Sequence, residues 1–124
     1  MKLDSARVFV YNLPAAHDFY TGRLGLLLKA GGPGAGWCVY DAGGAQLVVE
    51  AVAPDAPEEE HALVGRFTGL SFEVPDIHAK HAELQALGVH FTGAPERQAW
   101  GGLLATFVDP AENQLQLVQI GRPG

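Results

Sequence analysis

The sequence contains an internal repeat, and this repeat restricts the folds that the chain can adopt. A β-branched and aromatic stretch opens each copy, at residues 7–11 in the first and 70–74 in the second. An amphipathic segment follows in both copies and ends at a Leu-Gly pair, which begins at Leu24 and, 63 positions later, at Leu87. Two copies of this length predict two similar supersecondary units that face one another, with a site between them.

The order of elements is the same in both copies: one strand, one helix and three strands. Asn12 and Pro14 are typical of a helix start, and Gly25 is typical of a helix end. We expect strands near residues 6–11, 26–30, 36–41 and 45–52, then near 69–74, 89–92, 102–108 and 114–119, with the second helix over 76–87.

Length and composition indicate a single domain, residues 1–124, built from two βαβββ repeats over about 1–56 and 68–120. The segment between the repeats is acidic and contains prolines, which is typical of an exposed linker. With 48% hydrophobic residues, the chain can bury a substantial core. We therefore expect an α+β fold.

The charge of the chain argues against several classes of partner. The net charge is -6, and the eight Lys and Arg residues form no cluster, so we expect neither nucleic acid nor an acidic membrane surface as a partner. No apolar stretch is long enough to span a membrane, and we expect no signal peptide. Cys38 stands alone, so we expect a small buried hydrophobic residue in a reducing cytoplasm.

Two motifs carry a resemblance to a known family. Residues 19–26 read Phe-Tyr-Thr-Gly-Arg-Leu-Gly-Leu, and residues 106–117, which follow a Trp-Gly-Gly segment, read Thr-Phe-Val-Asp-Pro-Ala-Glu-Asn-Gln-Leu-Gln-Leu. Both motifs resemble those of the vicinal oxygen chelate superfamily, which includes glyoxalase I, extradiol dioxygenases, fosfomycin resistance enzymes and bleomycin resistance proteins. The resemblance implies tandem βαβββ units that form a half-open, curved mixed sheet, completed by a second chain as a homodimer.

The metal-dependent members of this superfamily hold a divalent ion on four side chains, two from each unit. The resemblance places these positions at Ser5, Glu50, Gly69 and Gln116, although the internal repeat matches Gln116 with Val48 instead. One carboxylate and two neutral oxygens form a poor ligand set, because a divalent ion needs about three strong protein ligands. We therefore expect no cofactor, and a divalent metal only if the strand registers are wrong.

The alternation of side chains along each strand predicts which residues line the cleft. With Ser5 pointing inward, Arg7 and Phe9 share its face, while the residues between them pack under a helix. The same reasoning places Gln46 and Glu73 in the cleft. Arg7 and Glu73 each lie on the first strand of a unit, so we expect them either to pair across the pseudo-twofold axis or to bind a ligand.

Two tryptophans are further candidates for ligand contact. Trp100 lies in a glycine-flanked loop, where it is either a lid over the cleft or a packing plug, and Trp37 lies at a strand start. The expected ligand-binding residues are therefore Ser5, Arg7, Phe9, Trp37, Gln46, Glu50, Glu73, Trp100 and Gln116.

These features predict a metal-independent protein that binds a small amphipathic or aromatic molecule, such as an antibiotic, in the cleft of a homodimer. The bleomycin resistance branch is the closest analogy, with sequestration of the ligand rather than turnover. The alternative is an enzyme of the same superfamily: a metal-dependent lyase of the lactoylglutathione lyase type, a dioxygenase, or a metal-free isomerase. Glu50 and Glu73 are the candidate catalytic bases of that isomerase.

Overall fold

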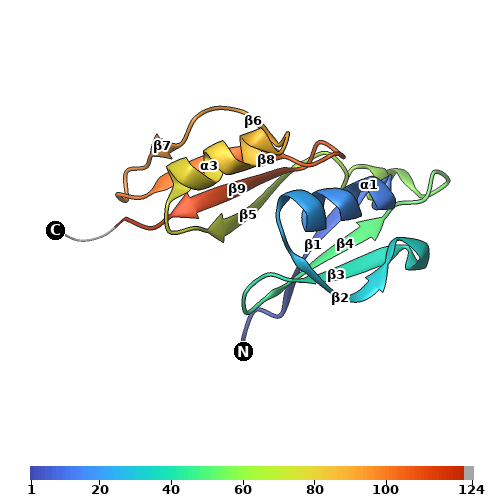
Figure 1. Ribbon diagram of the computed structural model, residues 1–124. Coiled ribbons are helices and arrows are strands. Elements are labelled where there is room, and N and C mark those ends of the chain that lie inside the picture. Colours follow the sequence, from blue (N-terminus) through green and yellow to red (C-terminus); the bar gives the residue numbers. More distant parts are fainter. Residues whose placement is uncertain (122–124) are drawn as a thin grey trace.

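The computed structural model describes residues 1–121, which form two halves with the same order of elements (Figure 1). The first half contains β1 (Ser5–Val10), α1 (Leu13–Asp18), the π-helical turn η1 (Phe19–Arg23), β2 (Leu27–Gly32), the 3-10 helix η2 (Pro33–Ala35), β3 (Trp37–Asp41) and β4 (Gln46–Ala51). The second half contains β5 (Phe67–Glu73), α3 (Ile77–Ala86), β6 (His90–Phe91), β7 (Glu96–Arg97), β8 (Leu103–Val108) and β9 (Gln114–Gln119). The short helix α2 (Glu58–His61) connects the halves.

Each half forms its own open, mixed sheet. The strand order is β1-β4-β3-β2 in the first sheet and β5-β9-β8-β6 in the second, with β7 also paired to β8. In both sheets the first strand of the half runs parallel to the last, and the other neighbours are antiparallel. Figure 1 shows α1 against the first sheet and α3 against the second, on the same side of the molecule. The predicted α+β fold is confirmed.

The helices begin and end where the sequence predicts. The side chains of Asn12 and Asp76 each accept a hydrogen bond of 3.1 Å from the backbone three residues later, which caps α1 and α3. Gly25 and Gly88 follow the helical segments with φ angles of 74° and 88°, a left-handed conformation that favours glycine. No helix within residues 1–121 is long and apolar enough to cross a membrane.

The structure differs from the sequence-based expectation at two connections. The expected linker contains α2, because Pro57 begins a helical turn whose first residues are acidic and therefore suit the positive end of the helix dipole. The loop before β8 contains β7, where Glu96 pairs with Leu104. Both elements are too short to produce a periodic sequence signal.

A hydrophobic core lies between the helices and the sheets. Alternate residues on β1, β3 and β4, including Val8, Tyr40 and Leu47, are buried beneath α1. Cys38 belongs to this set and is fully buried, as predicted. In the second half, Phe107 and Leu115 pack in the same cluster as the buried residues of α3.

The two halves are joined by aromatic and polar contacts. The ring of Phe19 lies 6.2 Å from that of Phe107, measured between ring centroids. Asn113, which is fully buried, donates a hydrogen bond of 2.8 Å from Nδ2 to the backbone oxygen of Phe9 and accepts one of 2.9 Å from the Gly65 backbone. Contacts of this kind fix the position of one sheet relative to the other.

Candidate functional site

The candidate site is made of the sheet surfaces that lie opposite the helices, together called the open face. Alternation along the strands places buried residues under the helices and leaves the intervening residues partly or fully exposed. The open face consists of Ser5, Arg7, Phe9, Trp37, Val39, Gln46, Val48 and Glu50 in the first sheet, and of Ser71, Glu73, Leu104, Thr106, Gln116 and Val118 in the second.

An ion pair occupies the open face of the first sheet. Arg7 Nη1 pairs with Glu50 Oε1, and the two side chains are 54% and 34% exposed. The expected pairing of Arg7 with Glu73 is therefore wrong. The reason is the strand order: Phe9 on β1 is in register with Glu50 on β4, which brings Glu50 next to Arg7, whereas Glu73 belongs to the other sheet.

The strand pairing resolves which residue of β4 matches Gln116 in the internal repeat. Arg7 and Ser71 each lie five positions before the residue that caps the following helix. Arg7 is in register with Val48, and Ser71 is in register with Gln116. Val48 is therefore the equivalent of Gln116, and Glu50 lies one open-face position further along β4.

The residues at the positions of the family's metal ligands do not fit a divalent metal, and Ser5 offers only a neutral hydroxyl. Gly69 has no side chain and lies at an irregularity of β5 with a φ of 76°. Gln116 donates a hydrogen bond of 3.2 Å from Nε2 to Thr106 Oγ1. Val48 offers no donor atom, and Glu50 is already bound to an arginine. Within residues 1–121, no group of three His, Cys, Asp or Glu side chains is placed to hold a metal ion.

Both tryptophans lie partly exposed against glycines, one beside each sheet. Trp37 is 42% exposed, and its indole covers Gly31, where an added Cβ would lie 2.6 Å from the ring. Trp100 is 55% exposed and lies against Gly102, where an added Cβ would lie 1.9 Å from the ring. Trp37 is in register with Glu50, so it lies next to the ion pair, whereas Trp100 lies in the loop between β7 and β8.

A hollow between the two sheets brings together two of the predicted binding residues. Gln46 and Glu73 both line this hollow of about 390 Å³, along with Ser71 and Phe72. The hollow lies where residues of β1 and β4 in the first sheet come close to residues of β5 in the second. Ser5 is paired with Gln46 at the same end of the first sheet.

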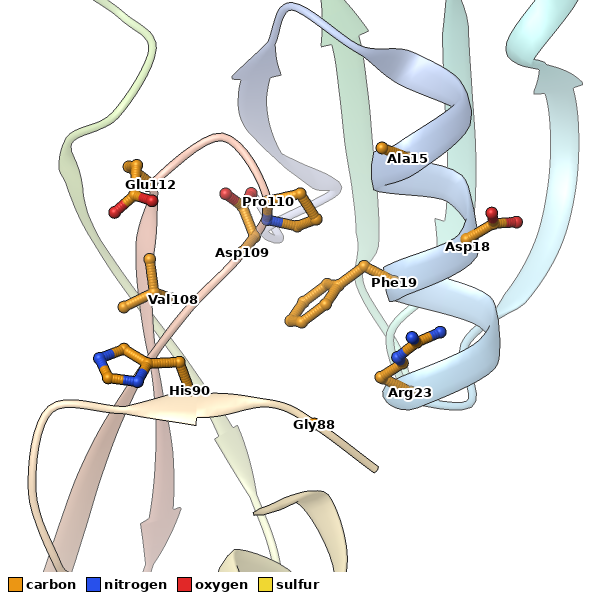
Figure 2. Close-up of a pocket in the computed structure, with 10 residues that line it drawn as sticks. All are labelled: Ala15, Asp18, Phe19, Arg23, Gly88, His90, Val108, Asp109, Pro110 and Glu112. Atoms are coloured by element: carbon orange, nitrogen blue, oxygen red, sulfur yellow. The ribbon is translucent and has the colours of Figure 1, made fainter. Parts of the chain in front are cut away.

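A larger pocket of about 480 Å³ lies between α1 with η1 and the ends of β6 and β8 (Figure 2). None of the predicted ligand-binding residues lines it. The two motifs that carry the family resemblance form its opposite walls, with Phe19 pointing toward the side that holds Val108 and Asp109. Ionisable groups of both signs line it, including Arg23 and Glu112. Sequence reasoning missed this pocket because its residues come from the ends of elements rather than from one strand face.

Asp109 is not free to bind a ligand in that pocket. Its Oδ2 accepts hydrogen bonds from the Tyr20 hydroxyl at 2.8 Å and from Asn113 Nδ2 at 3.1 Å. Its Oδ1 accepts two more, from the backbone of Ala111 and Asn113. Burial, followed by the nearby Asp109 charge, raises the pKa of Tyr20 well above its ordinary value, so Tyr20 stays neutral and donates. Burial also raises the pKa of Tyr40.

Comparison with known proteins gives a family for this fold. The family model of the Glyoxalase/Bleomycin resistance protein/Dioxygenase superfamily matches residues 2–117. A search of curated proteins finds none that matches the chain.

Solved structures of the same superfamily superpose on nearly the whole chain. A superfamily member from Sphaerobacter thermophilus is 31% identical, with a TM-score of 0.78 over 96% of this chain and 97% of its own. TnmS3, an antibiotic binding protein from a Streptomyces species, is 30% identical, with a TM-score of 0.76 over 98% of this chain and 97% of its own. A lactoylglutathione lyase from Agrobacterium tumefaciens is 20% identical, with a TM-score of 0.77 over 95% and 92%, and supports the fold alone. The chain therefore belongs to the glyoxalase/bleomycin resistance protein/dioxygenase superfamily.

Proposed function

We propose that the protein binds a small amphipathic aromatic molecule on the open face and releases it unchanged. The observation that carries this proposal is the position of Trp37: its indole stays 42% exposed beside the Arg7–Glu50 pair, where an aromatic ligand could stack on the ring and bond to the charged groups. Phe9 adds a second, half-buried ring on the same face.

The similarity to an antibiotic binding protein at 30% identity over nearly the whole chain supports binding of a small molecule such as an antibiotic. The enzyme alternatives have less support. A metal-dependent reaction would need ligands that Gly69, Val48 and Gln116 do not supply. A metal-free isomerase would need a free carboxylate base: Glu50 is engaged by Arg7, and Glu73, which lines the hollow between the sheets, is the candidate that remains.

We further propose that a second copy of the chain covers the open face. Both sheets leave this face without a helix, and it carries half-buried apolar residues such as Val39 and Val118 between the polar ones. A homodimer would enclose the ligand between two such faces and exclude water from it.

The test is a titration of intrinsic tryptophan fluorescence with planar aromatic compounds, including glycopeptides of the bleomycin type. We expect saturable quenching, and mass spectrometry after prolonged incubation is expected to recover the compound unchanged. The absence of saturable quenching by every compound would contradict the proposal. Conversion of a glutathione adduct or a catechol would instead support the enzyme alternative.

A further inference from the structure

A small pocket lies at the outer edge of the open face, where the second sheet meets the chain segment between β6 and β8. Its volume is about 220 Å³. Two pairings hold the segment against β8 at the edge of the sheet: Glu96 is in register with Leu104, and the Thr92 backbone donates a hydrogen bond of 2.9 Å to the Thr106 oxygen. The polar side chains that line the pocket are Thr92, Glu96, Gln98, Thr106 and Gln116.

Each of the two glutamine amides of this pocket already uses one of its two N–H donors within the protein. Gln98 donates from Nε2 to the backbone oxygen of Glu96 at 3.0 Å. Gln116 donates from Nε2 to Thr106 Oγ1 at 3.2 Å. Neither amide group therefore presents its full set of N–H donors to a ligand.

The acceptors of the pocket, in contrast, remain available. The Glu96 carboxylate forms no ion pair or side-chain hydrogen bond with any other group of residues 1–121, and the same holds for the amide oxygens of Gln98 and Gln116. No lysine or arginine within residues 1–121 lines the pocket. The nearest arginine in sequence, Arg97, bonds instead to the backbone oxygen of Gly101 at 3.3 Å.

We propose that this pocket binds the positively charged, N–H-rich end of the ligand: an ammonium, amidinium or guanidinium group. One carboxylate and two amide oxygens complement such a cation, and the hydrogen bonds to the carboxylate are charge-assisted and therefore strong. An anionic group would meet the Glu96 charge with few free donors to compensate. This inference rests on the proposed function, because it assigns one end of the molecule that the open face binds.

Three compounds of nearly the same shape test the inference: benzamidine, benzamide and benzoate, which are cationic, neutral and anionic. Each is titrated into the full-length protein while backbone amide signals are followed by heteronuclear NMR. We expect benzamidine to shift the amides of residues 92–98, 106 and 116 and to bind more tightly than benzamide, with benzoate weakest.

Two variants that each lose one negative charge distinguish binding in the pocket from a general attraction of the cation to the acidic protein. In Glu96→Gln, we expect the affinity for benzamidine to fall about threefold to fivefold, because Glu96 is exposed and water screens its attraction to the cation. Glu83→Gln is the matched control, because Glu83 lies on α3, against the opposite face of the same sheet, and pairs there with Lys80. This variant is expected to bind benzamidine like the original protein.

The outcomes distinguish this inference from the function on which it rests. If benzamidine shifts no amide of the pocket, or if Glu96→Gln and Glu83→Gln weaken binding equally, the inference is wrong. If benzamide or benzoate then shifts amides near Phe9 and Trp37, the proposed binding function stands without the cation pocket. If the pocket binds benzamidine but no aromatic compound reaches Phe9 or Trp37, the pocket is retained and the wider binding function fails.

Discussion

The hydroxyl of Tyr20 donates a hydrogen bond of 2.8 Å to Asp109 Oδ2 across 89 positions of the chain. Both residues are buried, and they belong to different halves of the molecule. The same carboxylate binds the backbone of Ala111 and Asn113, so the turn after β8 is held against η1. The contact between these two residues therefore couples the packing of the halves to the shape of one turn.

We expect Tyr20→Phe to lower the free energy of unfolding by about 1 to 2 kcal/mol, because a buried carboxylate loses one donor and retains the others. The pH dependence gives an independent readout. The folded protein holds the Tyr20 pKa above its ordinary value of 10.0, so the unfolded chain ionises first as the pH rises. The Tyr20 hydroxyl therefore contributes its full stabilisation of the folded protein below about pH 10. This stabilisation is lost progressively as the pH rises further.

Urea unfolding of both proteins from pH 7 to pH 11 checks this prediction. The stability of the original protein should fall more steeply above pH 10 than that of Tyr20→Phe, because the variant lacks this titration. Parallel curves over the whole range would show that the Tyr20 hydroxyl does not contribute through its ionisation.

Asn113→Ala is expected to destabilise the protein by about 3 kcal/mol or more. The side chain is fully buried and bonds to Phe9, Gly65, Arg66 and Asp109, so its removal leaves several buried polar groups without partners. Chemical unfolding measures the loss, and Gln85→Ala on the exposed side of α3 is the control, with an expected change within about 0.5 kcal/mol. A similar small change for both variants would contradict a structural role for Asn113.

Replacement of either tryptophan is expected to weaken ligand binding without a large change in stability. Trp37→Ala and Trp100→Ala should each weaken binding of a quenching aromatic ligand about tenfold, because the ligand loses an indole surface. Thermal stability should change little, since both side chains are about half exposed, at 42% and 55%. Leu87→Ala, at the end of α3, is a control of similar exposure. A large fall in the melting temperature of Trp100→Ala, with unchanged affinity, would identify Trp100 as a packing plug.

Purified protein is expected to hold well below one divalent metal ion per chain, measured by elemental analysis. The combined variant Ser5→His, Val48→Glu and Gln116→Glu should gain a metal site, because it supplies three strong ligands at equivalent positions of the two halves. Gly69 is left unchanged, since its positive φ makes any side chain there strained. The double variant Ser5→His and Gln116→Glu keeps Val48 and leaves Glu50 as the third strong ligand. Metal binding by this double variant, but not by the triple variant, would contradict the assignment of Val48.

Light scattering is expected to give about twice the chain mass of 13.1 kDa at micromolar concentration. Val48→Arg should shift the protein to a monomer, because it places a charge at the centre of the open face that a second copy would desolvate. Glu59→Arg changes the charge of an exposed residue on α2, outside the strands that form this face, and should leave the mass unchanged. A monomeric mass for the original protein would contradict the proposal that a second copy covers the site.

The order of elements could be predicted from the sequence because its determinants are local. Asn12 and Asp76 cap the helices, Gly25 ends the first, and the alternation along β1 separates the buried residues from those of the open face. The family resemblance extended these signals to the whole fold. These features depend on residues close together in the chain, so each can be predicted without knowing which distant residues pack against it.

The contacts of the site depended on tertiary structure. The pairing of Arg7 with Glu50 follows from the register of β1 against β4, and the match of Val48 with Gln116 follows from the same pairing in both halves. The free acceptor atoms around Glu96 can be identified only from the register of β7 against β8 and from the hydrogen bonds of the Gln98 and Gln116 side chains. Register joins residues that are distant in sequence, and an irregularity such as that at Gly69 shifts the register by an amount that the local sequence does not specify.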